Sequence, residues 1–130
     1  MTYLETIIES KRKTKESGRS LVELQKLVEE NPRNDIRKIE FSNKLDVIAE
    51  IKRKSPSKGH LADIENPDEL AKIYEKNDAC LISVLTDEQY FGGSIKDLEQ
   101  VRDAVKVPVL RKDFAIDLTD VYETYLTGAD

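Results

Sequence analysis

Apolar and polar positions change pattern near residue 46, and from there one arrangement is repeated three times. Each repeat begins with a short apolar run, which predicts a strand. A loop of small and polar residues follows, and apolar residues at helical spacing then predict a helix. The predicted strands cover residues 47–52, 79–85 and 107–112. The predicted helices cover residues 67–76, 95–105 and 119–126.

The first 45 residues carry a helical pattern without strands. Residues 2–30 place apolar side chains at helical spacing, with a polar stretch in the middle that interrupts the pattern. Ser20 is predicted to cap the helix after this interruption, with Glu23 as its capping-box partner. Residues 31–45 are predicted to be a connector with a few apolar anchors, at Ile36, Ile39, Phe41 and Leu45.

Short polar residues mark the ends of two later helices. Asn66 is predicted to cap the helix that starts with Pro67, and Ser94 the helix that follows. At the end of the first of these helices, Asn77 is predicted to adopt the left-handed conformation that stops a helix.

Strand, loop and helix in repeated succession predict parallel strands with right-handed helical crossovers. Open doubly wound sheets and TIM barrels both contain such units. The loop at Ser55–Gly59 lacks the glycine fingerprints of nucleotide-binding sheets, and polar residues follow all three strands, which favours the barrel. We therefore expect an α/β fold of the TIM (β/α)8-barrel type. A helical extension over residues 1–45 precedes the first three βα units of an incomplete barrel over residues 46–130.

Composition restricts the classes of function. The net charge of −5 argues against general affinity for nucleic acid. Cys80 is the single cysteine, so no intramolecular disulfide forms, which fits a reducing cytoplasm, and we expect its side chain to be buried. With one histidine and one cysteine there is no structural zinc set. No apolar run approaches the ~20 residues of a membrane span, so we expect no contact with a membrane.

The first predicted strand and its loop, VIAEIKRKSPSKG at Val47–Gly59, carry candidate chemistry. Alternation along a strand places Glu50 and Lys52 on the same face. The loop after them offers hydroxyls, backbone N–H groups and a cation, which suit an anion. The alternative is an edge strand whose charges face water.

The third predicted strand ends in Lys112, which we expect at the same mouth as Glu50 and Lys52. Two ammonium groups beside one carboxylate, with Phe91 and Phe114 nearby, suit an anionic aromatic substrate. For Lys112, the alternative is an ion pair with Glu50 or Asp113 at the rim of the sheet. For the two phenylalanines, the alternative is a place in the core.

Three segments together resemble the indole-3-glycerol-phosphate synthase family: Val47–Gly59, ISVLTDEQYF at 82–91 and PVLRKDF at 108–114. The resemblance implies a TIM barrel with an N-terminal helical segment, and a carboxy-lyase of tryptophan biosynthesis. The implied reaction closes a ring in 1-(2-carboxyphenylamino)-1-deoxyribulose 5-phosphate with loss of carbon dioxide and water. It implies neither a cofactor nor a metal.

The same resemblance gives the charged residues roles at the reacting atoms. Lys112 matches the general-acid lysine of the family. Lys52 matches a second lysine that contacts substrate and takes part in later proton transfers, and Glu50 matches the glutamate beside it. An acid is needed at the ketone oxygen as the ring carbon attacks.

Three further residues are implied to bind substrate. Ser55 matches a substrate-contacting serine in the loop after the first strand. Phe91 and Phe114 match aromatic residues that line the pocket for the anthranilate ring.

The family's remaining catalytic and phosphate-binding residues match no position up to Asp130, so we expect half of an active site and no activity from this chain alone. The implied partner is a small phosphorylated substrate, together with self-association or a complementing C-terminal half. The alternative function is a non-catalytic half-barrel module for binding or self-assembly, pairing through exposed strand edges. A relative of phosphoribosylanthranilate isomerase does not account for the combined KRKSPSKG and RKDF motifs.

Overall fold

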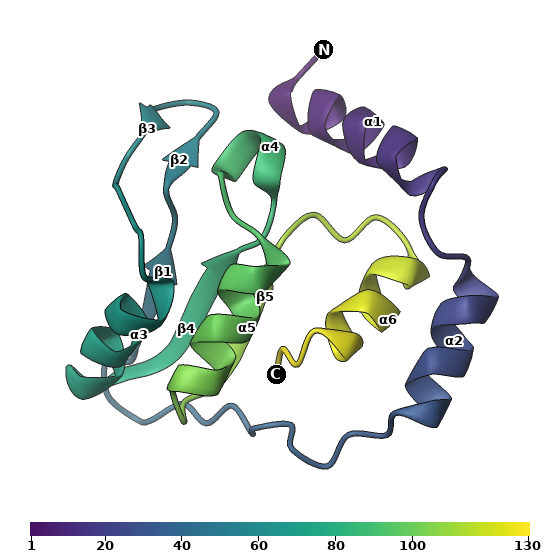
Figure 1. Ribbon diagram of the computed structural model, residues 1–130. Coiled ribbons are helices and arrows are strands. Elements are labelled where there is room, and N and C mark those ends of the chain that lie inside the picture. Colours follow the sequence, from purple (N-terminus) through teal and green to yellow (C-terminus); the bar gives the residue numbers. More distant parts are fainter.

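The computed structural model describes every residue from Met1 to Asp130. Helices and strands follow one another along the chain as Figure 1 shows. The helices are α1 (Tyr3–Lys15), α2 (Leu21–Glu30), α3 (Pro67–Lys76), α4 (Glu88–Phe91), α5 (Ile95–Ala104) and α6 (Leu118–Leu126). The strands are β1 (Val47–Ile51), β2 (Lys54–Ser55), β3 (Gly59–His60), β4 (Ala79–Leu85) and β5 (Val109–Lys112). None of the helices has the length and apolar content needed to cross a bilayer.

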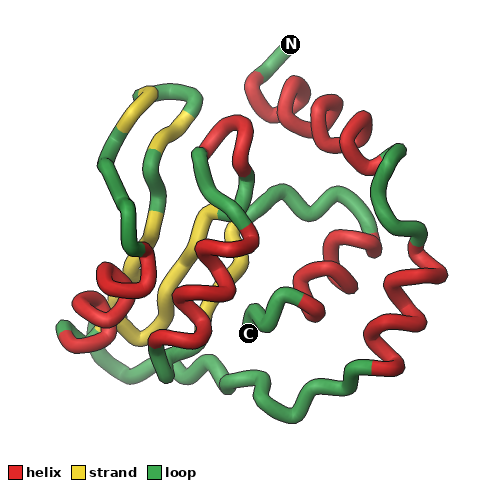
Figure 2. The backbone as a smooth tube through the Cα atoms, in the orientation of Figure 1, coloured by secondary structure: helices red, strands yellow, loops and turns green.

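Three strands form a parallel sheet in the order β1-β4-β5, with β4 in the centre. Helix α3 connects the first two strands and α5 the last two, so each crossover is a βα unit, as the repeating pattern predicted. Both crossover helices cover the same face of the sheet (Figures 1 and 2). Because the three strands are parallel, their carboxyl ends lie at the same end of the sheet, and the loops that follow them lie close together there.

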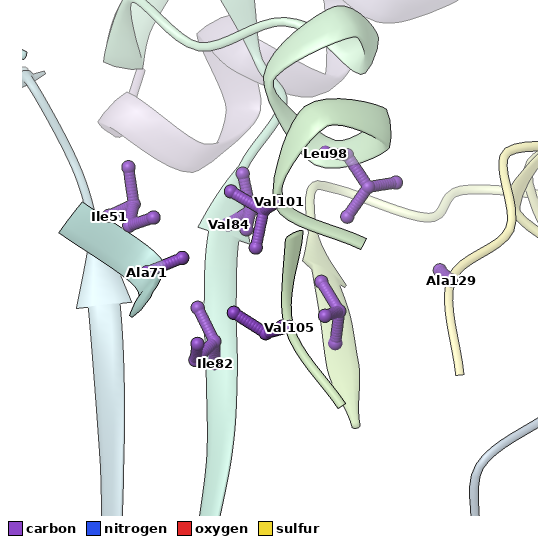
Figure 3. Close-up of a cluster of buried hydrophobic side chains, with 9 residues drawn as sticks. Ile51, Ala71, Ile82, Val84, Leu98, Val101, Val105 and Ala129 are labelled. Atoms are coloured by element: carbon purple, nitrogen blue, oxygen red, sulfur yellow. The ribbon is translucent and has the colours of Figure 1, made fainter. Parts of the chain in front are cut away.

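The hydrophobic core fills the space between the sheet and its two crossover helices (Figure 3). Alternate residues of β4, the fully buried Ile82 and Val84, point into it, and Leu98 and Val101 of α5 pack against them. The other residues of the cluster are Ile51, Ala71, Val105, Val109 and Ala129. Because alternate strand residues face opposite ways, the remaining positions are left for the other face of the sheet.

The N-terminal extension is helical, as predicted, and both of its helices begin with a capping box. Ser20 and Glu23 form the predicted one, and Thr2 and Glu5 form another at the start of α1. Helix α2 packs against α6, and the connector 31–45 then leads to β1 (Figure 2).

Arg37 attaches the connector to helix α5, to the segment before β5 and to the last residue of the chain. Arg37 donates hydrogen bonds from its guanidinium to the carbonyl oxygens of Val107, at 2.9 Å, and Arg102, at 3.1 Å. Its backbone N–H donates to the buried carboxylate of Asp130 at 2.8 Å. These contacts hold the connector in place, although it has no regular secondary structure.

Some local predictions were wrong. The loop after β1 contains the antiparallel pair β2–β3, and the loop after β4 contains α4. Both elements are too short to show a periodic pattern. Asn66 precedes α3 without a side-chain cap, and Asp78, with φ 65°, takes the left-handed position predicted for Asn77. Cys80 is half-buried rather than buried.

Candidate functional site

Charged side chains from two strands meet at the carboxyl edge of the sheet. The carboxylate of Glu50, on β1, lies 3.0 Å from the ammonium group of Lys112 at the end of β5. It also lies 3.3 Å from the ammonium group of Lys52, which directly follows β1. Ser83, on the central strand β4, donates its hydroxyl to the same carboxylate at 3.1 Å. The three charged residues that sequence reasoning selected thus form one cluster.

The environment of Glu50 favours its ionised form. Burial raises the pKa of this carboxyl group, but hydrogen bonds from Lys112 and Ser83, with the Lys112 charge, outweigh that effect and lower the pKa. Glu50 is therefore an anion at neutral pH that holds two ammonium groups in place. The rim ion pair considered as the alternative for Lys112 is present with Glu50, while Asp113 pairs with Lys11 instead.

An aromatic-lined cavity of about 520 Å³ lies beside this cluster. Four predicted site residues line it: Lys52, Ser55, Phe91 and Phe114. The two phenylalanine rings face each other at a tilt of 41°, with their centroids 6.0 Å apart. Lys52 belongs to both the charged cluster and the cavity wall, so the two parts of the site adjoin.

Part of the cavity wall was not predicted from the sequence. Helix α1 contributes Tyr3, Leu4 and Ile7, which had been assigned only to a helical pattern. Tyr3 and Leu4 are 69% and 52% exposed, so apolar groups of the extension face open space at the site. The apolar positions of α1 predict a helix with one apolar face, but no local pattern identifies the surface that this face meets.

The loop after β4 is shaped so that Phe91 reaches the cavity. Asp87 caps α4 by accepting a hydrogen bond from the Tyr90 N–H at 2.7 Å. Gly93 then donates its N–H to the Asp87 carbonyl oxygen at 2.9 Å. A Cβ atom at Gly93 would lie 1.8 Å from the Leu85 carbonyl oxygen, so only glycine allows this return to the end of β4.

The chemistry of the site follows from these groups. No three histidine, cysteine, aspartate or glutamate side chains lie close enough together to hold a metal ion. Lys52 and Lys112 offer proton donors and positive charge beside one carboxylate. The phenylalanine pair offers an apolar wall next to them. The arrangement suits a ligand that has both an aromatic ring and anionic groups.

Comparison with known proteins places the whole chain next to one family. The sequence model described as indole-3-glycerol phosphate synthase matches residues 4–130. A protein of that name from Beutenbergia cavernae is 44% identical over 135 aligned residues, which cover 100% of this chain and 50% of the relative. The Aquifex aeolicus protein is 47% identical over 111 residues, covering 85% and 43%. The Kineococcus radiotolerans protein is 57% identical over 84 residues, covering 65% and 31%. The chain spans at most about half the length of these relatives.

Proposed function

Because the chain belongs to the indole-3-glycerol phosphate synthase family, we propose that it contributes its charged cluster and aromatic cavity to the active site of a carboxy-lyase of tryptophan biosynthesis. The substrate is 1-(2-carboxyphenylamino)-1-deoxyribulose 5-phosphate, and the reaction needs no cofactor. The observation that carries the proposal is that the carboxylate of Glu50 lies within 3.3 Å of the ammonium groups of both Lys52 and Lys112, beside the Phe91–Phe114 wall.

Each residue has a part in the proposed reaction. The aromatic ring of the substrate lies against Phe91 and Phe114, whose faces and edges suit ring contacts. As the ring carbon that bears the carboxylate attacks the ketone, Lys112 protonates the ketone oxygen, and carbon dioxide then leaves. Loss of carbon dioxide restores the aromatic benzene ring. The new hydroxyl group then takes up a proton and leaves as water, and loss of a proton from the neighbouring CH2 carbon completes the indole.

The other polar groups support these steps. Through their ion pair, Glu50 keeps the ammonium group of Lys112 at the carboxyl ends of the strands. Lys52 contacts the substrate and takes part in the later proton transfers, and Ser55 donates a hydrogen bond to a substrate oxygen. Positive charge at the site also stabilises the anionic groups of the substrate.

Indole fluorescence tests the proposal directly. The chain is mixed with the substrate, alone and together with the C-terminal half of the Aquifex aeolicus relative, which this chain does not match. We expect indole formation only in the presence of the complementing half, and we expect Lys112→Ala to abolish it. Lys13→Ala, at an exposed lysine of α1, is the matched control and should retain the signal. Indole formation that survives Lys112→Ala contradicts the assigned role.

The proposal extends to organisation and partners. Residues 1–45 act as a helical extension that closes one side of the cavity, and residues 46–130 supply the sheet. Strands β1 and β5 each pair with β4 alone, which leaves an open edge on either side for a second copy or a complementing half. Sedimentation at several concentrations separates self-association from a monomer. We also propose that the protein is located in the cytoplasm.

A further inference from the structure

One ammonium group touches both loops that carry the phenylalanines. The Nζ atom of Lys11, on α1, lies 2.5 Å from Asp113 and 3.4 Å from Asp87. Asp87 belongs to the loop after β4, and Asp113 directly follows β5. The side chains of the two aspartates are only 6% and 10% exposed, so a nearby cation matters for both.

Each of these carboxylates places one phenylalanine. Asp87 caps α4, the single helical turn that ends in Phe91. Asp113 accepts a hydrogen bond from the backbone N–H of Phe114 at 2.7 Å. Lys11 thus contacts both carboxylates that place the phenylalanine rings, although it neither lines the cavity nor belongs to the charged cluster.

We propose that Lys11 is a positioning residue, which couples helix α1 to the Phe91–Phe114 pair by neutralising Asp87 and Asp113 together. The coupling follows from the contacts alone. Its meaning for the anthranilate ring rests on the proposed function.

The two aspartates do not depend on Lys11 equally. Asp113 also accepts a hydrogen bond from the Thr86 hydroxyl at 2.7 Å and lies 3.6 Å from the guanidinium of Arg111. Asp87 has Lys11 as its only cationic neighbour within 4 Å. Removing the ammonium group therefore leaves Asp87 as a buried, unpaired charge, which forces its side chain to turn toward water and disturbs the cap of α4. Phe91 should respond more than Phe114.

Fluorine NMR of the chain labelled with 4-fluorophenylalanine measures both rings at once. The sequence has three phenylalanines, and the third, Phe41, is 63% exposed in the connector and gives an internal control signal. In Lys11→Met we expect the Phe91 signal to shift most and the Phe114 signal less, with Phe41 unchanged. Lys11→Arg should restore both signals, because its guanidinium reaches the same carboxylates.

Two further variants separate positioning from a general loss of structure. Lys13→Met removes an exposed lysine from the same helix and should shift neither ring. Adding Asp87→Asn to Lys11→Met keeps an oxygen to cap α4 and removes the unpaired charge, so the Phe91 signal should return toward its original position. An unchanged Phe91 signal in Lys11→Met, an equal shift in Lys13→Met, or no return in the double variant overturns the proposal.

The same labelled chain keeps this inference distinct from the proposed function. Added anthranilate should shift the Phe91 and Phe114 signals of the unsubstituted chain if the cavity binds the aromatic ring. Should anthranilate shift neither signal while Lys11→Met still shifts Phe91, the coupling stands and the assigned ligand is wrong.

Discussion

The carboxylate of Glu50 and the ammonium group of Lys112 lie 3.0 Å apart, although 62 positions separate them in the sequence and strand β4 lies between their strands. Neighbouring strands are about 4.8 Å apart, so the pair reaches across two strand spacings. On β4 the register partner of Lys112 is Leu85, and that of Glu50 is Ser83, which is small and donates a hydrogen bond to the same carboxylate. A small residue at this central position lets the two long side chains meet.

Lys112→Met should raise the pKa of Glu50. Burial already raises this pKa. The hydrogen bond from Lys112 is the largest effect that lowers it, followed by the hydrogen bond from Ser83 and the charge of Lys112. Without the two effects of Lys112 the balance moves toward the neutral acid. Carboxyl carbon NMR over a pH titration measures the change, and Lys58→Met, at an exposed lysine, is the matched control. If the Glu50 pKa is the same in both variants, the ion pair does not set it.

The lowered pKa of Glu50 also makes the stability of the chain depend on pH. Because the pKa of Glu50 is lowered in the folded chain, its contribution is present above the ordinary value of 4.5 and is lost as pH falls through the lowered value. Lys112→Met should therefore reduce the free energy of unfolding more at neutral pH than in acid.

Gly93→Ala should destabilise the chain by about 3 kcal/mol or more. The added Cβ atom would lie 1.8 Å from the carbonyl oxygen of Leu85, a backbone atom that cannot turn away. Gly18→Ala is the control, since its nearest contact is 3.4 Å away, and it should change stability by less than about 0.5 kcal/mol. Urea unfolding followed by circular dichroism gives both values, and equal midpoints for the two variants would contradict the close approach.

Much of the fold could be predicted because its regular elements are long and strongly patterned. The bounds of α3 and β4 match the predicted helix 67–76 and strand 79–85. The parallel sheet fits the start of a TIM barrel, and family membership confirms that fold class. Helix α4 and the β2–β3 pair were missed because an element of one turn or two residues leaves no period in the sequence.

The positions of some residues of the candidate site could be predicted from the sequence, and those of others could not. Alternation along β1 and β5 was enough to bring Glu50 and Lys112 to one face. Ser83 was not predicted, because its place depends on the register between strands. The contact of Lys11 with the strand loops was missed because the sequence does not show how the extension folds back. The catalytic and binding roles of the site residues stay predictions.

Arg37→Met should cost about 1–3 kcal/mol of stability. The substitution keeps an unbranched apolar stem but removes the donors to the carbonyl oxygens of Val107 and Arg102. Those oxygens then lose their partners in a partly buried place. Lys38→Met, at a neighbouring lysine that is 82% exposed, should stay within about 0.5 kcal/mol in the same urea assay. A smaller loss for Arg37→Met than for Lys38→Met would show that the connector is not held by these bonds.

Protonation of Asp117 in strong acid should lower the free energy of unfolding of the chain. Hydrogen bonds from the Thr119 hydroxyl and from Lys15 lower the pKa of this carboxyl group to about 2, below its ordinary 3.8. Its contribution is therefore fully present above 3.8 and is lost as pH falls through about 2. Because the side chain is 49% exposed, we expect the loss to stay below about 1 kcal/mol.

Asp117→Asn isolates this effect, since the amide oxygen still accepts the Thr119 N–H at the start of α6 while the charge facing Lys15 is gone. The difference in the free energy of unfolding between neutral pH and about pH 2 should be smaller in this variant than in the unsubstituted chain. Asp103→Asn, at an exposed aspartate of α5, should leave the difference unchanged. An equal decrease in both variants would mean that acid acts through the net charge of the chain and not through the contacts of Asp117.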